Sequence, residues 1–327
     1  MSQVIVITGA SGGIGRATAV AFAHRGAKLA LLARGEAGLA AAKKDAETAG
    51  AAQVITLRTD IADFEQVEAA AAQAEQALGP IDVWVNNAMA TIFSPLQEIT
   101  PAEFKRATEV TYLGSVWGTM AALKRMRLRN RGTIVQVGSA LAYRGIPLQA
   151  PYCGAKFAVR GFLDSLRSEL IHEGSKVHVT MVQLCAFNTP QFVWGRTHMK
   201  QAPQPLPPIF DPHMAASAIV WAATHRRREL WVGFPTVKTI LGARLIPGLL
   251  DHYLAKKAWA GQLTDNDTAA GRPDNLFNPA AGDFGIHGPF TDRARSNSWQ
   301  LRLAEHRAAV IAVAAVAVML VALPMVW

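Results

Sequence analysis

The chain has 327 residues, half of them hydrophobic, which is enough to bury one large core or two smaller ones. Its 33 Lys and Arg outnumber its 24 Asp and Glu, so a nucleotide phosphate, a nucleic acid or an acidic lipid surface is a plausible partner. The two cysteines, Cys153 and Cys185, exclude a disulfide framework, and the first residues, MSQVIVITGA, lack the pattern of a signal peptide.

Short apolar runs alternate with Ala-rich stretches of helical period from residue 1 to about residue 232. This alternation is typical of repeated βαβ units around a parallel sheet. We therefore expect an α/β fold, with one doubly wound parallel sheet of about seven strands inside a domain over residues 1–235. The predicted strands are 4–7, 28–32, 53–57, 82–85, 133–138, 176–184 and 229–232.

The segments after the sixth strand have a different character. Residues 187–212 contain many prolines and aromatic residues, so we expect a long loop or lid there. Residues 236–260 are expected to form two short amphipathic helices, with Pro247 beginning the second. These helices either pack on the body or lie on an acidic membrane surface. Residues 261–307 follow, and their content of Asp, Asn, Gly and Pro predicts an extended linker.

The last twenty residues, 308–327, carry no charge. Twenty apolar residues are the length that a helix needs to cross a bilayer, so we predict a transmembrane anchor, with a buried C-terminal helix as the alternative. Arg302 and Arg307 precede this segment and favour a catalytic domain on the cytoplasmic side. Membrane lipid is therefore an expected partner.

A glycine-rich stretch, TGASGGIG at 8–15, follows the first strand and leads directly into a helix. Glycine suits this position because the turn is tight and because a pyrophosphate must approach the backbone closely. In this context the stretch predicts a dinucleotide site. We expect cofactor contacts from Gly9, Ser11, Gly13, Ile14 and Gly15.

The second strand ends with Ala33 and Arg34, without a carboxylate. An acidic residue at this place binds a free ribose 2′-hydroxyl, whereas an arginine accommodates a 2′-phosphate. The sequence therefore favours NADP(H) as cofactor. NAD(H) is the alternative, in which case Arg34 is an ordinary surface residue.

Several motifs occur together: TGASGGIG, Asp60 in RTDIAD, NNA at 86–88, Ser139 and YCGAK at 152–156. With them, residues 1–235 resemble the short-chain dehydrogenase/reductase family. The resemblance implies a single Rossmann domain. It also implies that Asp60 and Ile61 lie beside the adenine, that Asn87 and Ala88 lie near the ribose, and that Thr189 contacts the nicotinamide amide or a phosphate.

Three polar residues form the expected reaction centre. Ser139 follows the strand at 133–138, and the carboxyl ends of parallel strands are where ligands bind. Tyr152 and Lys156 are four residues apart on the next predicted helix, so they share one face. The lysine charge would favour the phenolate and could also hold the nicotinamide ribose. Ser139 would bind the substrate oxygen, and Tyr152 would donate a proton to it as the cofactor delivers hydride. We predict an oxidoreductase acting on a carbonyl or secondary alcohol, with no metal.

One site position departs from the family pattern. The resemblance implies an Asn that holds water in a proton relay, but this chain has Thr111 there. A hydroxyl can also bind water, although it lacks the two amide donors, so we expect a working but modified relay through Thr111.

Two other functions are compatible with these motifs: a dinucleotide-binding scaffold or sensor on a membrane, and an epimerase or dehydratase. The aromatic residues of the lid, together with the anchor, suggest a bulky apolar substrate. The resemblance implies a homodimer through helices near 103–128 and 151–172, although a tethered monomer is the alternative. We expect no nucleic-acid partner, because the arginines at 226–228 are interpreted as a solvated turn. The lid aromatics are Phe187, Phe192, Trp194 and Phe210.

Overall fold

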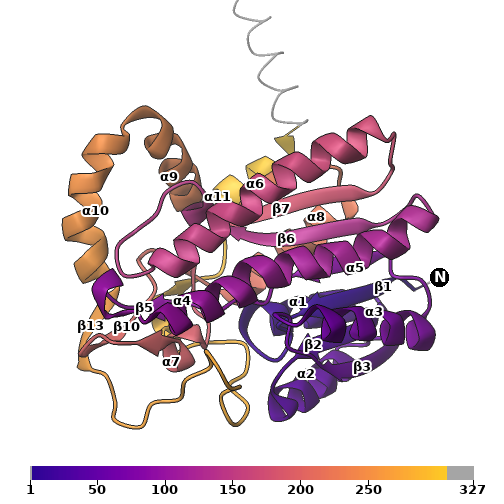
Figure 1. Ribbon diagram of the computed structural model, residues 1–327, viewed down its shortest axis with the longest axis horizontal. Helices are drawn as coiled ribbons and strands as arrows, with labels where there is room; N and C mark the ends of the chain where they lie inside the picture. The colour runs from indigo at the N-terminus through magenta and orange to yellow at the C-terminus, as the bar shows by residue number, and fades with distance from the viewer. Residues whose placement is uncertain (1, 308–327) are drawn as a thin grey trace, which may run out of the picture.

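The structure, a computed structural model, describes residues 2–307. A sheet of seven parallel strands, in the order β12-β7-β6-β4-β1-β2-β3, forms its centre (Figure 1). All seven predicted strands are present, with every boundary within two residues of the prediction. The strands are β1 (Val4–Thr8), β2 (Lys28–Ala33), β3 (Gln53–Arg58), β4 (Val83–Asn86), β6 (Thr133–Ser139), β7 (His178–Leu184) and β12 (Glu229–Trp231).

The strand order reverses at β1, which lies between β2 and β4. Val4 is in register with Lys28 on one side, and Ile5 is in register with Val83 on the other. All five residues of β1 are buried, as expected for a central strand covered on both faces. A reversal of this kind opens a crevice beyond the carboxyl ends of the strands, where ligands bind.

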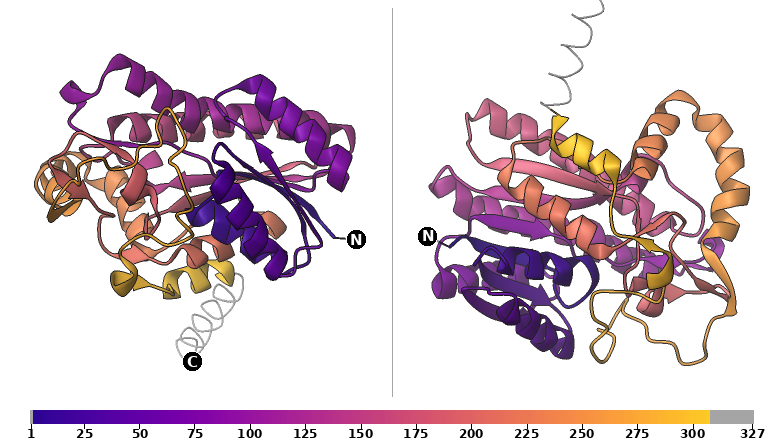
Figure 2. Two further views of the ribbon diagram at one scale, coloured as in Figure 1. Left: turned by 90° about the horizontal axis from the view of Figure 1, so that it is seen from below. Right: turned by 180° about the vertical axis from the view of Figure 1, so that it is seen from behind.

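Helices cover both faces of the sheet (Figures 1 and 2). The two hydrophobic cores lie between these helices and the strands. On one face, α3 (Phe64–Leu78), α5 (Gly114–Leu128) and α6 (Ala150–His172) pack around Trp84 and Met126. On the other, α1 (Gly13–Ala23), α2 (Glu36–Thr48), α8 (Pro212–Thr224) and α11 (Trp299–Glu305) pack around Phe22 and Met214. This arrangement confirms the doubly wound α/β fold.

The segment 187–212 is more ordered than the loop that the sequence predicts. It contains short strands that pair with distant parts of the chain: β9 with β5, β10 with β13, and β11 with both β8 and β14. Strands of two or three residues leave no periodic pattern, so only their partners define them. The elements are β5 (Ile92–Phe93), β8 (Ala186–Phe187), α7 (Gln191–Trp194), β9 (Arg196–Thr197), β10 (Gln201–Pro203) and β11 (Ile209–Phe210).

The two helices predicted at 236–260 are present. They are α9 (Phe234–Leu245) and α10 (Pro247–Gly261), and Pro247 begins the second, as predicted. In Figures 1 and 2 they form an arm at one side of the molecule.

The segment 261–307 differs from the extended linker that its composition predicts. Its strand β13 (Leu263–Asp267) pairs with β10, and β14 (Ala294–Arg295) pairs with β11. Leu276 and Leu301 are buried in the two cores. A few apolar side chains and backbone pairs therefore hold a mostly polar segment against the body.

No helix within residues 2–307 has the length and apolar character that a membrane crossing requires. The transmembrane helix predicted at 308–327 lies outside the described residues.

Candidate active site

The glycine-rich loop joins β1 to α1. Gly9 and Gly13 have φ values of 65° and 55°, which residues with a side chain rarely adopt. A Cβ atom on Gly15 would lie 2.2 Å from the carbonyl oxygen of Gly9. Glycine is therefore required for the backbone conformation of this turn. At position 15 it is required because the Gly9 carbonyl leaves no room for a side chain.

The NNA motif connects the glycine-rich loop to β4. The Thr8 hydroxyl oxygen accepts hydrogen bonds from the backbone N–H groups of Asn87 at 3.0 Å and Ala88 at 3.1 Å. The Asn87 amide donates in return to the carbonyl oxygens of Thr8 and Gly9. These bonds hold the ends of β1 and β4 together at the crevice.

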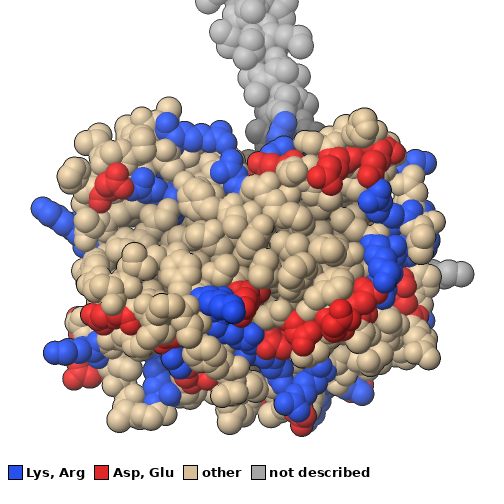
Figure 3. All heavy atoms as spheres, in the orientation of Figure 1, with Lys and Arg blue, Asp and Glu red and all other residues tan. Residues whose placement is uncertain are grey.

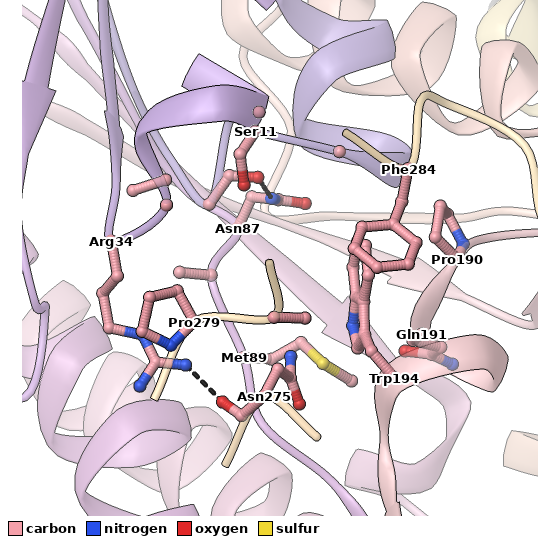
Figure 4. Close-up of a pocket in the computed structure, with 18 of the residues that line it drawn as sticks. Ser11, Arg34, Asn87, Met89, Pro190, Gln191, Trp194, Asn275, Pro279 and Phe284 are labelled. Carbon is pink, nitrogen blue, oxygen red and sulfur yellow. Dashed lines mark hydrogen bonds between the residues drawn. The ribbon is translucent and has the colours of Figure 1, made fainter. Parts of the chain in front are cut away.

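A cleft extends from the glycine-rich loop across the ends of β2 and β3 (Figure 4). Among the predicted cofactor residues, Gly15, Tyr152 and Lys156 do not line this part. The predicted residues that do line it are Gly9, Ser11, Gly13, Ile14, Arg34, Asp60, Ile61, Asn87, Ala88 and Thr189.

Arg34 points across the cleft towards a segment that the sequence analysis did not include in the site (Figure 4). Its guanidinium donates to the carbonyl oxygens of Phe277 at 2.9 Å, Leu276 at 3.3 Å and Asn275. Burial lowers the pKa of Arg34, while the nearby Asp60 carboxylate opposes this effect. The guanidinium is thus held in place beside the end of β2.

Ser139, Tyr152 and Lys156 line a second cavity together. Ser139 is the last residue of β6, and the other two lie one turn apart on α6. The Lys156 ammonium lies 5.4 Å from the centre of the Tyr152 ring and donates to the Val137 carbonyl oxygen at 2.8 Å. The structure therefore brings three of the four predicted catalytic residues, Ser139, Tyr152 and Lys156, into one cavity, which Thr111 does not line.

Burial controls the ionisation of this group. It lowers the pKa of Lys156 to about 8, so the ammonium is charged at neutral pH. It also raises the pKa of Tyr152, and the neighbouring Ser139 side chain opposes this only in part. The phenol therefore keeps its proton at neutral pH, because burial outweighs the lowering of the pKa that the sequence leads us to expect from Lys156. A protonated phenol suits a proton donor.

Thr111 lies at a π-helical turn, Glu109–Leu113, between α4 (Pro101–Thr108) and α5. Its side chain is fully buried, and the hydroxyl both donates to the Ala90 carbonyl and accepts from the Ala90 N–H, each at 2.9 Å. The hydroxyl proton is therefore hydrogen-bonded to the backbone, and a proton relay through Thr111 stays a prediction.

The two cavities are continuous, because Ile14, Asn87, Met89, Thr189 and Gln191 line both. Of the four lid aromatics, three line the two cavities and Phe210 does not. Phe187 and Phe210 pack against each other in the core, with ring centres 6.1 Å apart, and Phe187 also borders the second cavity. Phe192 lines the second cavity, and Trp194 lines the cofactor cleft.

One group of possible metal ligands occurs within residues 2–307: Asp211, His213 and His287. It lies outside the residues that line the two cavities. Asp211 caps the first turn of α8 through the His213 N–H, and its carboxylate is 3.0 Å from His287. The cluster thus has a structural role at the beginning of that helix.

Residues 3–198 match the short chain dehydrogenase family model, which is more than half of the chain. The chain belongs to the short-chain dehydrogenase family. It is 32% identical over 299 residues to the oxidoreductase YxnA of Bacillus subtilis, a match covering 91% of this chain and 82% of YxnA. Over 192 residues it is 35% identical to the 3-dehydrosphinganine reductase of Danio rerio, covering 58% of this chain and 57% of that protein. The levodione reductase of Leifsonia aquatica is 36% identical over 178 residues, covering 54% and 67%.

Membership of this family makes the chain an oxidoreductase that acts on carbonyl or hydroxyl groups with a nicotinamide dinucleotide. It leaves the hypothesis of a non-catalytic scaffold without support. The cleft fits such a cofactor. Its glycine-rich loop leads into the N-terminus of α1, and because Gly9 and Gly13 have no side chains, a pyrophosphate can approach the backbone closely.

Proposed function

We propose that this short-chain dehydrogenase is an NADP(H)-dependent reductase of apolar carbonyl compounds, with a catalytic domain over residues 1–235. One observation carries the proposal. Ser139, Tyr152 and Lys156 share a cavity that continues into the cleft under the glycine-rich loop. A substrate carbonyl in this cavity would therefore meet both a proton donor and the cofactor.

The glycine-rich loop and Arg34 would hold the dinucleotide, which would supply a hydride to the substrate carbon or accept one in the reverse direction. The Tyr152 phenol, protonated at neutral pH, donates its proton to the carbonyl oxygen. The Ser139 hydroxyl donates a hydrogen bond to the same oxygen and stabilises the charge that develops there. The Lys156 ammonium, charged below about pH 8, stabilises the phenolate that remains.

Arg34 supports the preference for NADP(H) over NAD(H). It stands at the end of β2 on the wall of the cleft, and Ala33 before it offers no carboxylate for a 2′-hydroxyl. A guanidinium forms paired hydrogen bonds with phosphate oxygens, so it suits a 2′-phosphate. Asp60, whose carboxylate is paired with Arg106, and Ile61 form the neighbouring wall for the adenine.

The full-length protein should oxidise NADPH faster than NADH with a panel of carbonyl compounds. Tyr152→Phe should lower the rate at least about 100-fold, because a general acid contributes about 10²–10⁴. NADPH binding, measured by fluorescence, should be retained. Tyr253→Phe is the matched control, since Tyr253 lies on α10 and is 59% exposed. Turnover by Tyr152→Phe at the wild-type rate would contradict the proposal.

The lining of the second cavity supports an apolar substrate. Leu184, Phe187, Phe192, Leu206 and Leu254 contribute to it. Relatives of this chain include proteins named 3-dehydrosphinganine reductase and estradiol 17-beta-dehydrogenase 11. A panel graded by chain length tests this point: long-chain carbonyls should have the higher kcat/KM, and a preference for small polar carbonyls would contradict it.

Attachment to the cytoplasmic face of a membrane is the second part of the proposal. The uncharged residues 308–327 would form a transmembrane anchor. The arm, α9 and α10, exposes Leu245 by 77% and Leu249 by 69%, near the basic residues Arg244 and Lys256. Such a mixture of apolar and basic side chains suits an acidic lipid surface.

Vesicle flotation tests this attachment. The full chain should float with vesicles containing acidic lipid, and a chain ending at residue 307 should float weakly and in a salt-sensitive manner. Leu249→Glu should weaken that residual binding, while Leu96→Glu, also on an exposed leucine, should not. A full chain that stays with the soluble fraction would contradict the anchor.

A homodimer through α5 and α6 is a further part of the proposal. Figure 3 shows a broad area with few charged residues over these helices. Met120 on α5 and Phe157 on α6 are 46% and 43% exposed there. Light scattering of the full chain in detergent should give twice the monomer mass, and Phe157→Arg should reduce it to the monomer. A wild-type chain of monomer mass would exclude the dimer.

A further inference from the structure

A segment near the C-terminus lies opposite the glycine-rich loop. We call residues 272–288 the strap; it is the orange coil along the lower edge of the molecule in Figure 1. It lies beyond residues 3–198, which match the family. The strap residues that line the cofactor cleft are Asn275, Pro279, Ala280, Gly282 and Phe284.

The first end of the strap is fixed to the substrate lid. Arg272 donates to the carbonyl oxygens of Phe192 at 2.9 Å and Val193 at 2.8 Å. Asp274 forms an ion pair with Arg196 of β9. Next to it, Leu276 is fully buried and its carbonyl accepts from Arg34. This end therefore belongs to the folded body.

The other end is fixed next to Thr189. The Gly288 N–H donates to the Asn188 carbonyl oxygen at 3.1 Å, and His287 lies 3.0 Å from the Asp211 carboxylate. A Cβ atom on Gly288 would lie 2.5 Å from the carbonyl oxygen of Thr189, so the backbones are in close contact. The strap is thus anchored on both sides of the cleft.

The middle of the strap is more exposed than its ends. Residues 277–283 are exposed except for Ala280, which is half-buried. Asp283 pairs with the buried Arg16 of α1, and the Phe284 ring packs edge-on against Trp194 with centres 4.8 Å apart (Figure 4). The Gly285 carbonyl accepts the N–H of Gly13 at 3.0 Å. The glycine-rich loop is therefore covered by the strap on its open side.

We propose that the strap is the outer wall of the dinucleotide site and that its middle, residues 277–285, must lift to let the cofactor enter or leave. The inference rests on the proposed cofactor binding. Arg34, Pro279 and Phe284 line the same cleft as the glycine-rich loop (Figure 4), so a dinucleotide bound along the loop and Arg34 would be covered by Pro279 and Phe284. The two anchored ends act as hinges, and the Asp283–Arg16 pair acts as the latch.

A disulfide tests whether the strap must open. A Cβ atom on Gly35 would lie 3.5 Å from the Cβ of Pro279, which is within the range of about 3.5–4.5 Å for disulfides. Gly35 has a φ of −89°, which any residue adopts. The native thiols do not compete, because burial raises the pKa of Cys153 to about 11 and of Cys185 to about 12. The test variant is therefore Gly35→Cys/Pro279→Cys in the full chain.

The measurement is the rate at which bound NADPH is displaced by excess NADP⁺, followed by fluorescence. Release from the oxidised double variant should be at least about tenfold slower than from its reduced form, because closed lids limit release. Adding a reductant should restore the rate. Equal rates in the oxidised and reduced forms, with the cross-link shown by mass spectrometry, would overturn the inference.

A second variant keeps the test independent of the cross-link. Asp283→Ala should speed NADPH release about tenfold, because it removes the ion pair with Arg16 that holds the middle of the strap closed. Asp292→Ala, an exposed residue beyond the strap, is the matched control and should leave the rate unchanged. Equal release rates for the two variants would overturn the latch. A wild-type chain that binds NADH but no NADPH would overturn only the cofactor preference, and the same rates would then be measured with NADH.

Discussion

The Glu103 carboxylate is the centre of a buried ion network that joins α4 to the lid. It is 4% exposed and accepts hydrogen bonds from Arg196 at 2.6 Å and from the Thr100 N–H at 2.8 Å, with His198 at 3.0 Å. Arg196 also pairs with Asp274 of the strap. Replacing Glu103 by Gln removes the charge while keeping the size and most of the hydrogen-bonding capacity of the side chain.

The expected magnitude follows from the pKa of Glu103. Burial alone would raise this pKa, but the hydrogen bonds from Arg196 and Thr100 and the charge of His198 lower it from 4.5 to about 2. The unfolded chain therefore binds a proton more readily than the folded chain. The resulting stability is fully present above pH 4.5 and is lost as the pH falls towards 2. At 1.36 kcal/mol for each unit, the charge contributes up to about 3 kcal/mol.

Urea unfolding of the wild type and of Glu103→Gln tests this value. At pH 7 the variant should be less stable by up to about 3 kcal/mol, and the difference should shrink as the pH falls from 4.5 towards 2.5. Glu98→Gln is the matched control on an exposed glutamate and should change stability by less than about 0.5 kcal/mol. A difference for Glu103→Gln that is the same at pH 7 and pH 3 would refute the reasoning.

Three further predictions concern the loop, the lysine and the strap. Gly15→Ala places a Cβ 2.2 Å from the Gly9 carbonyl oxygen, so it should cost about 1–3 kcal/mol or more and abolish NADPH binding; unchanged binding would refute it. Because burial lowers the pKa of Lys156 to about 8, wild-type stability relative to Lys156→Met should rise by up to about 3 kcal/mol between pH 8 and 10.5, and a constant difference would contradict this. Leu276→Ala should lower the free energy of unfolding in urea by about 2–5 kcal/mol, because Leu276 is fully buried. Leu96→Ala, on an exposed leucine, should change it by almost nothing. Equally small losses for both variants would show that the strap does not unfold together with the body.

The sheet and the reaction centre were predictable because their signals are local. A strand buried on both faces, such as β1, is a short apolar run that can be recognised without its partners. The glycine-rich loop needs its glycines for backbone reasons that hold within eight residues. Tyr152 and Lys156 share a face because four residues make about one helical turn. For these features the sequence alone determined both the structure and its place in the site.

The position of the strap over the cleft, by contrast, depends on tertiary contacts and could not be predicted from the sequence. Its composition is that of a linker, yet it contacts Arg34 from more than 240 positions away, and its single buried anchor, Leu276, has no periodic neighbours. The short strands of the lid likewise depend on partners elsewhere in the chain.

The protonation of the site and the engagement of Thr111 were also beyond the sequence. The proton on Tyr152 depends on burial, which arises from the packing of the whole body. The Thr111 hydroxyl is bound to the Ala90 backbone, 21 positions away, by a fold contact that residue type cannot reveal. The sequence thus determined which polar residues meet in the proposed reaction centre, because their spacing is a local property. Only the tertiary structure decided what surrounds them and what covers the cofactor cleft, because desolvation and long-range contacts exist only in the folded chain.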